Sequence, residues 1–177
     1  MAVPAVLLFE SRLTDIARLV RSAQAGDQEA FAELYQRFAR MVHGVVLARI
    51  ARTEVDDVVQ DVFVAALERI TELREPAAFG GWLAAIARHR ATDRWRRLAP
   101  VSPLTETAVP SQSHERLEAL AILDTIRSLP EAYSETLVLR LVEGMTGAEI
   151  AERTGLTPAS VRVNLHRGMK LLREKLS

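Results

Sequence analysis

Residues 146–160 read Thr-Gly-Ala-Glu-Ile-Ala-Glu-Arg-Thr-Gly-Leu-Thr-Pro-Ala-Ser, and this stretch contains two helix starts separated by a tight turn. Thr146 and Glu149 have the spacing of a capping box, in which each side chain satisfies a free amide at the first turn of a helix. Gly155 permits the backbone conformation of a sharp turn. Thr157, followed by a proline, predicts the start of a second helix that continues to the C-terminus.

The second predicted helix carries outward-facing side chains that are suited to DNA. Leu156, Val161 and Leu165 recur at helical spacing and would pack it against the first helix. Arginine can bind guanine edges or phosphate, asparagine can bind adenine edges, and valine can touch the methyl group of thymine. This is the anatomy of a DNA-binding helix-turn-helix. The residues predicted to contact duplex DNA are Thr157, Ser160, Arg162, Val163, Asn164, Arg167 and Lys170.

The charge changes sign within this part of the chain. Residues 115–152 contain eight acidic and three basic residues, whereas residues 162–175 contain five basic residues and one acidic residue. An ordinary helical hairpin uses the same small and apolar residues and is the alternative interpretation, but it does not account for the reversal. Motif and charge together favour DNA binding.

Nearly every other informative stretch has the apolar spacing of a helix, and no stretch of comparable length alternates with period two. Helices are predicted at residues 14–25, from Asp27 onward, and at 53–70, 78–97, 115–128 and 130–144. Three prolines and no basic residue in 98–113 predict an extended linker. We therefore expect an all-α protein of two small helical domains joined by a flexible linker, with boundaries at 1–97, 98–114 and 115–177.

The composition narrows the class of protein. The chain has 177 residues, of which 49% are hydrophobic and 26% are charged, as in soluble globular proteins. The absence of cysteine excludes disulfides and thiolate metal sites. No secretory signal and no apolar run long enough for a spanning helix occurs, so we expect a cytoplasmic protein without membrane insertion. The net charge of zero argues against a nucleic-acid binder unless it is the sum of opposed patches.

The predicted helix at 53–70 has an acidic outer face. Residues 52–75 contain seven acidic and three basic residues. The stripe opposite the apolar face includes Glu54 and the four residues predicted to bind a basic protein surface: Asp57, Gln60, Asp61 and Glu68. The alternatives are a merely solvated face or a divalent-metal site, but no histidine, nucleophile or phosphate-binding loop accompanies the carboxylates.

The predicted helix at 78–97 has the opposite sign, with five arginines and one aspartate between residues 88 and 97. Positive charge combined with aromatic rings suits backbone contact and stacking on unpaired bases. The alternative is that Phe79 and Trp82 belong to the core. The residues predicted to contact unpaired DNA are Phe79, Trp82, Arg88, His89, Arg90, Arg94, Trp95, Arg96 and Arg97.

Four segments in order, at the right separations, resemble the extracytoplasmic-function sigma factors of bacterial RNA polymerase. They are Gly26-Asp-Gln-Glu-Ala-Phe-Ala-Glu-Leu-Tyr35, Asp56-Asp-Val-Val-Gln-Asp-Val-Phe63, residues 79–97 and residues 129–167. Two places depart from the family. His89 stands where asparagine is common, and Arg162-Val-Asn164 stands where Lys-Ser-Arg is common, so the base preference is expected to differ.

The resemblance implies a protein that is not an enzyme and that needs no cofactor or metal. It would bind core RNA polymerase at the clamp coiled coil of the large subunit and at the flap region, the clamp being contacted by the acidic stripe. The loop at 71–78 and the arginine-rich helix would capture and open the upstream-ten element of promoter DNA, and the last helix would read the upstream-thirty-five element. An anti-sigma protein covering the same surfaces is a further expected partner.

Two other classes of protein stay open on the sequence. A stand-alone helix-turn-helix regulator would bind DNA without polymerase and would have no need of the acidic stripe. A nuclease would use Asp56, Asp57 and Asp61 with a metal ion, but no other catalytic group accompanies these three residues.

Overall fold

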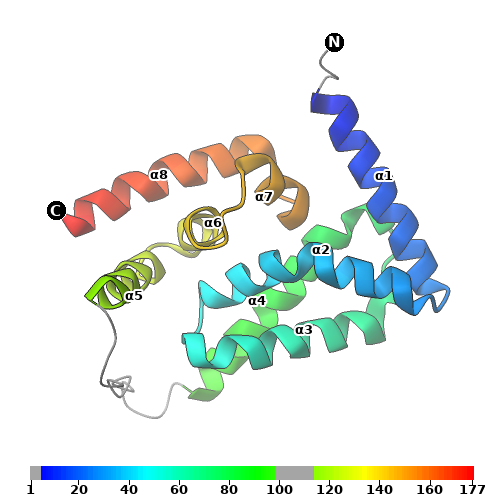
Figure 1. The fold of residues 1–177 in the computed structure, drawn as a ribbon, viewed down its shortest axis with the longest axis horizontal. Coiled ribbons are helices and arrows are strands. Elements are labelled where there is room, and N and C mark those ends of the chain that lie inside the picture. The colour runs from blue at the N-terminus through cyan, green and yellow to red at the C-terminus, as the bar shows by residue number, and fades with distance from the viewer. Residues whose placement is uncertain (1–4, 99–113) are drawn as a thin grey trace.

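The structure is a computed structural model that describes the backbone of residues 5–98 and 114–177 and the side chains of 14–98 and 117–177. All regular elements in the described ranges are helices, and none of these residues forms a strand, so the predicted all-α fold class is confirmed (Figure 1). The α-helices are α1 (Ala5–Gln24), α2 (Gln28–Leu47), α3 (Val55–Arg69), α4 (Phe79–Leu98), α5 (His114–Arg127), α6 (Glu131–Leu141), α7 (Gly147–Thr154) and α8 (Pro158–Leu176).

The helix boundaries follow the local signals in the sequence, with small departures. Asp27 caps α2 by accepting hydrogen bonds from the backbone N–H groups of Glu29 and Ala30. The helix predicted at 53–70 is α3 flanked by short 3-10 turns at Arg52–Glu54 and Ile70–Glu72. A third such turn, Pro76–Ala78, precedes α4. The helix predicted at 130–144 is shorter, because Pro130 is extended and acts as the cap, and α6 ends at Leu141.

The helix-turn-helix forms as predicted. Thr146 accepts a hydrogen bond from the Glu149 backbone N–H, and the Glu149 carboxylate accepts one from the Thr146 backbone N–H at 2.8 Å. Gly155 ends α7 with φ +75°, in the left-handed region that glycine adopts without strain. Thr157 caps α8, with Pro158 in its first turn.

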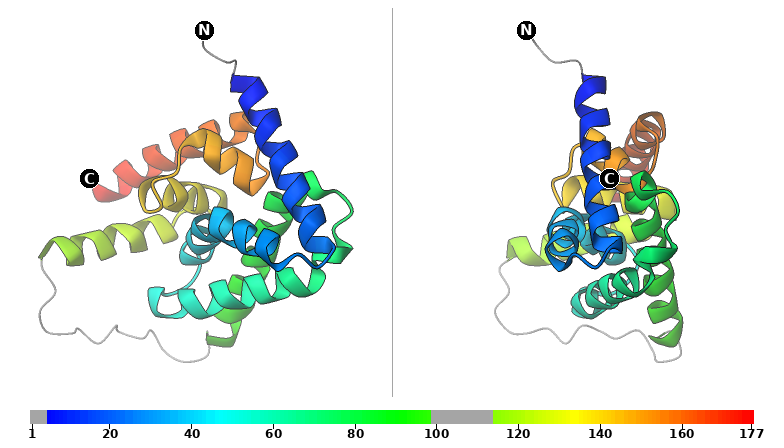
Figure 2. Two further views of the ribbon diagram at one scale, coloured as in Figure 1. Left: turned by 45° about the vertical axis from the view of Figure 1, so that its right-hand side comes forward. Right: turned by 90° about the vertical axis from the view of Figure 1, so that its right-hand side faces the viewer.

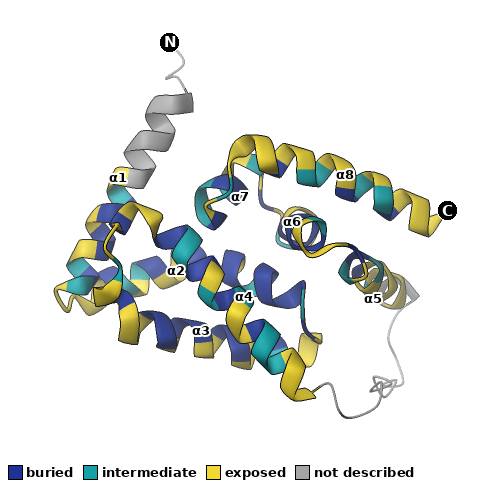
Figure 3. Ribbon diagram, turned by 180° about the vertical axis from the view of Figure 1, so that it is seen from behind, coloured by how far each residue is buried: buried dark blue, intermediate teal, exposed yellow. Residues whose placement is uncertain are grey.

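The core of the first half is built around α2, whose inner face packs against α1, α3 and α4 (Figure 3). Leu34, Phe38, Met41, Val42 and Val45 are essentially inaccessible to solvent. Burying side chains of this size contributes about 1.5–3 kcal/mol each relative to exposure. The core leaves the outer faces of α3 and α4 free to carry charge.

The two halves of the chain pack against each other, which the prediction of two domains and a linker did not anticipate. Helices α6 and α7 lie on α2 and α4, and one continuous cluster of buried apolar residues runs through both halves (Figure 2). Helix α4 ends at Leu98 and α5 begins at His114. The rest of the predicted linker lies outside the described residues, and the predicted domain boundaries stay a prediction.

A Thr146→Ala variant should lower the free energy of unfolding by about 1 kcal/mol, because it removes the cap of α7. Hydrogen bonds from Thr146 lower the pKa of Glu149. The contribution of the Glu149 carboxylate to the capping box is therefore complete above the ordinary glutamate pKa and is lost as pH falls through the lowered value, whereas the hydrogen bond from the Glu149 backbone N–H to Thr146 does not titrate. Chemical denaturation at neutral and acidic pH measures both effects. Thr71→Ala, at an exposed position in the first half, is the control; an equal loss in both variants would contradict the capping role.

Candidate functional site

The outer face of α3 carries the predicted acidic stripe. Asp57, Gln60, Asp61 and Glu68 are all exposed, while the opposite face of the helix is buried against α2 and α4. Spacings of three, four and seven residues place them on one side of an α-helix. The structure therefore presents these four side chains together to solvent, as the sequence predicted, and we call them the docking face.

Glu54 does not belong to the docking face. It lies in the 3-10 turn before α3, and its carboxylate accepts a hydrogen bond from Arg94 Nε at 2.7 Å and a second from Arg94 Nη2. The sequence pattern placed Glu54 in the acidic stripe because the helical spacing of α3 was extended to residues before the start of that helix. Its partner Arg94 is thereby tied to the start of α3.

An apolar groove of about 550 Å³ lies beside the docking face, and the sequence analysis missed it. Tyr35, Val64 and Leu67 are 45%, 50% and 53% exposed, and the Tyr35 ring packs on Phe63 with 4.4 Å between ring centroids. Asp56 and Gln60 line the same groove. Val64 and Leu67 lie outside the buried stripe of α3. Apolar residues off that stripe are the sequence signal that could have revealed the groove. Exposed apolar side chains bordered by polar ones are typical of a surface that binds protein.

Helix α4 presents part of its predicted DNA-binding set to solvent. Arg90, Arg96 and Arg97 are exposed, and so is His89, whose Nδ1 lies 3.2 Å from an Asp93 carboxylate oxygen. The Trp95 side chain is 58% exposed. An indole that is this accessible is not part of the core, and it lines a pocket with Arg49 and Arg96.

Arg88 is engaged with the other half of the chain. Its Nε and Nη2 donate hydrogen bonds of 2.9 and 2.8 Å to the two carboxylate oxygens of Glu135 on α6. These hydrogen bonds raise the pKa of Arg88 above its ordinary value. Both Arg88 and Arg94 must therefore exchange a carboxylate for a phosphate before they can bind DNA.

The two aromatic residues at the start of α4 have different environments. Phe79 is completely buried and packs edge-on against Phe38, with 5.1 Å between centroids, so its ring belongs to the core and cannot meet a base in this state. Trp82 is half-buried and lines a pocket of about 460 Å³ between α3 and α4. Arg69, His89 and Arg90 line the same pocket, which we call the base pocket. Arg69 was missed because it ends an otherwise acidic helix.

Helix α8 exposes most of its predicted DNA-contacting residues. Ser160, Arg162, Val163, Arg167 and Lys170 are exposed. Thr157 is occupied as the cap of the helix, and its hydroxyl also lies 2.8 Å from that of Ser160.

Asn164 is the exception on this helix. Its side chain is half-buried, and Nδ2 donates a long hydrogen bond of 3.4 Å to Thr136 Oγ1 on α6. The amide is thus turned partly toward the protein, and Arg162 and Val163 are the more accessible candidates for base contact.

Two negative findings apply to residues 14–98 and 117–177. No group of three or more histidine, aspartate or glutamate side chains in these ranges could hold a metal ion. Within the same part of the chain, no helix has the length and apolar character needed to cross a membrane.

The chain matches two family models in sequence order. Residues 34–100 match Sigma-70 region 2 and residues 119–172 match Sigma-70, region 4. The first match contains α3 and α4, with the docking face and the base pocket, and the second contains the helix-turn-helix. A stand-alone helix-turn-helix regulator is therefore not favoured.

Curated relatives cover nearly the whole chain. It is 31% identical to the ECF RNA polymerase sigma-E factor of Haemophilus influenzae, over 93% of this chain and 96% of the relative. It is 32% identical to the RNA polymerase sigma factor CnrH of Cupriavidus metallidurans, over 90% of this chain and 91% of the relative.

A solved structure of CnrH in complex with the cytosolic domain of CnrY is similar in fold, with a TM-score of 0.64 and 28% identity. The match covers 91% of this chain and 96% of that one. Sequence motifs, charge distribution, family models and relatives agree: this chain belongs to the extracytoplasmic-function sigma factors, and it is an alternative sigma factor that directs RNA polymerase to promoters.

Proposed function

We propose that the docking face and the neighbouring apolar groove bind core RNA polymerase at the clamp coiled coil of its large subunit. The observation that carries the proposal is their combination on one side of the molecule. Four exposed polar or acidic side chains on α3 lie beside a groove that exposes Tyr35, Val64 and Leu67. The groove would supply apolar contact area, while the carboxylates would attract a basic partner and select its orientation.

The base pocket and the exposed face of α4 are the proposed site of promoter opening. The pocket combines the wall of an indole, Trp82, with the cationic side chains of Arg69 and Arg90. A flipped base of the upstream-ten element would stack there, and Trp95 would stack on a neighbouring unpaired base. Arg96 and Arg97 would bind phosphates, joined by Arg88 and Arg94 once these leave their carboxylate partners.

Helix α8 is the proposed reader of the upstream-thirty-five element. Its exposed arginines and Val163 can enter the major groove while the remaining basic side chains hold the backbone. The second domain, at 115–177, would also contact the flap region of the polymerase, and the linker at 98–114 would connect the two domains.

We propose that the chain acts in the cytoplasm and that it is not an enzyme. We also propose that an inhibitory protein, an anti-sigma factor, covers the docking face and groove when transcription is off. Two observations support this partner: exposed apolar side chains of this size need a cover, and CnrH is in complex with the cytosolic domain of another protein.

Reversing the charge of the docking face with Asp57→Lys and Asp61→Lys should weaken binding to core RNA polymerase by about tenfold or more, because like charges across an interface are strongly unfavourable. Binding of each variant to surface-immobilised core polymerase measures the affinity. Glu29→Lys with Glu75→Lys makes the same charge change at exposed positions of the first half outside the docking face and is the control. Normal binding by the Asp57/Asp61 variant would refute the docking assignment.

Trp95→Ala should slow promoter opening by about tenfold to a hundredfold, since stacking of one base on an aromatic side chain contributes about 1–3 kcal/mol. Its effect on polymerase binding should be much smaller. Permanganate reactivity of unpaired thymines in the holoenzyme complex reports the opening. Trp95→Phe retains an aromatic face and should recover most of the rate; if alanine and phenylalanine behave alike, stacking is not the role of this residue.

Arg162→Ala should relax base preference at one position of the upstream-thirty-five element, with a loss of about 1–3 kcal/mol of discrimination. Lys170→Ala, further along the same helix, should weaken all promoters about equally because phosphate contacts carry no sequence information. In vitro transcription by the reconstituted holoenzyme on a library of randomised promoters separates the two results. An unchanged preference profile for Arg162→Ala would show that this residue does not read a base.

A further inference from the structure

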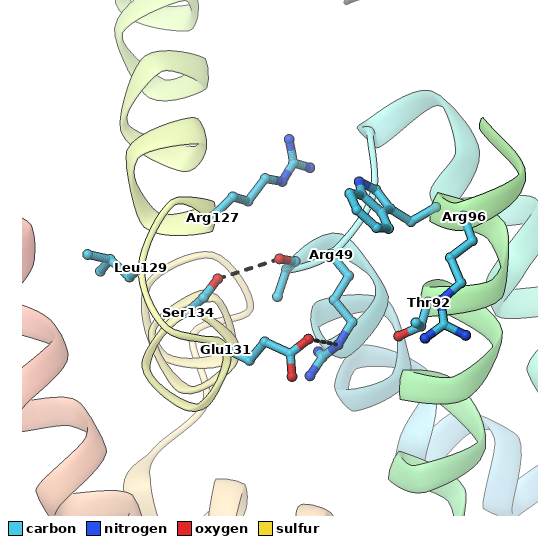
Figure 4. A pocket seen from close by; sticks show the side chains of 9 residues that line it. Arg49, Thr92, Arg96, Arg127, Leu129, Glu131 and Ser134 are labelled. Atoms are coloured by element: carbon cyan, nitrogen blue, oxygen red, sulfur yellow. Dashed lines mark hydrogen bonds and ion pairs between the residues drawn. The ribbon is translucent and has the colours of Figure 1, made fainter. Parts of the chain in front are cut away.

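A pocket of about 350 Å³ lies where the ends of α2 and α4 meet the end of α5 and the start of α6 (Figure 4). It shares no lining residue with the groove beside the docking face or with the base pocket, and we call it the arginine pocket. Its lining combines three guanidinium groups with an indole and two hydroxyls. These belong to Arg49, Arg96, Arg127, Trp95, Thr92 and Ser134.

Arg127 is held in a fixed orientation and still has an unused donor. Its side chain extends from the end of α5 toward the side of the pocket that α4 forms (Figure 4). Nε donates a hydrogen bond of 2.9 Å to the Leu47 carbonyl, and Nη1 donates one of 3.1 Å to an Asp124 carboxylate oxygen. Nη2 is buried and has no hydrogen-bond partner among the described residues. A buried charged donor without an acceptor is unfavourable, and an anion in the pocket would supply the acceptor.

The other two arginines of the pocket also retain positive charge. Arg96 is exposed, and its side chain makes no hydrogen bond or ion pair with residues 14–98 and 117–177. Nη2 of Arg49 lies 2.9 Å from a carboxylate oxygen of Glu135, but Arg88 binds the same carboxylate. Because one carboxylate serves two guanidinium groups, the charge of Arg49 is only partly neutralised.

The carboxylates nearest the pocket do not cancel this charge. Glu131 lines the pocket 3.9 Å from Nε of Arg49, but its side chain is 80% exposed. The side chain of Asp124, the partner of Arg127, is 73% exposed. Solvent screens exposed charges far more than buried ones, and the side chains of Arg49 and Arg127 are only 10% and 19% exposed. The electrostatic potential inside the pocket therefore favours an anion.

The rest of the lining indicates what the anion would carry. Trp95 lines the pocket beside the apolar side chains of Ala48 and Leu129, and an indole face stacks on any nucleobase. Guanidinium groups bind phosphate oxygens through charge-assisted hydrogen bonds. The volume lies at the small end of the range of small-molecule sites, about 300–1,000 Å³. The space therefore suits a single nucleotide rather than a length of strand.

We propose that the arginine pocket binds a free mononucleotide, with the phosphate held by the arginines and the base stacked on Trp95. The hydroxyls of Thr92 and Ser134 would donate hydrogen bonds to phosphate or sugar oxygens. Ser134 Oγ lies 3.5 Å from the carbonyl oxygen of Ala48, which is too long for a strong hydrogen bond, so this hydroxyl is available to a ligand. Arg127 takes no part in the proposed polymerase or DNA contacts, so its role in the pocket is independent of them.

The chain has two tryptophans, so Trp82→Phe leaves Trp95 as the only indole, and its fluorescence reports binding in the arginine pocket. Adenosine monophosphate should quench this fluorescence saturably. Adenosine and inorganic phosphate should each bind about tenfold more weakly or worse, because each lacks one part of the contacts. Arg96→Gln should weaken the nucleotide about tenfold by removing a charged donor. Arg97→Gln makes the same charge change at the next exposed position, outside the pocket, and should leave the affinity within about twofold.

Arg127→Gln should weaken adenosine monophosphate by a similar factor, and circular dichroism checks that this variant keeps its helix content; if it does not, the comparison of Arg96→Gln with Arg97→Gln decides alone. A single-stranded oligothymidylate should bind the Arg127→Gln variant as tightly as the parent, because the exposed arginines of α4 would hold it. Three results would overturn the proposal: no saturable quenching at millimolar nucleotide, equal losses in Arg96→Gln and Arg97→Gln, or a parallel loss of oligothymidylate and nucleotide affinity in a folded Arg127→Gln variant.

Discussion

The packing of the two halves of the chain is constrained by the burial of Glu135 between Arg49 and Arg88, beside an apolar cluster that runs through both halves. A carboxylate cannot be buried without charged or hydrogen-bonding partners, and here the partners come from the other half of the chain. This requirement fixes α6 against α2 and α4, and with α6 it fixes the helix-turn-helix against the start of α4. Arg88, one of the residues predicted to bind DNA, is engaged by Glu135 in this arrangement.

The zero net charge of the chain is the sum of surfaces with opposite signs. The exposed carboxylates of α3 and the exposed arginines of α4 lie on adjacent helices of one bundle. The proposed function needs both, because the chain would bind a basic surface of the polymerase and hold DNA. The cancellation weakens long-range attraction of the free chain to DNA.

The features predictable from the sequence are those set by neighbouring residues. The caps at Asp27, Thr146 and Thr157, the turn at Gly155 and the outer face of α3 each depend on a few consecutive positions, and the structure has them all. The pairings of Arg88 with Glu135 and of Arg94 with Glu54 were not predictable, because each joins residues 40 or more positions apart. Phe79 was predicted to contact DNA because it shares a helix with two tryptophans and five arginines, yet its ring fills the core beside Phe38.

Amide hydrogen exchange of the chain, free and bound to core RNA polymerase, tests the central claim that polymerase docks on α3. Exchange should slow along α3 around Asp57 and Asp61, where polymerase is proposed to bind. Unchanged exchange along α3 in the complex would contradict the claim.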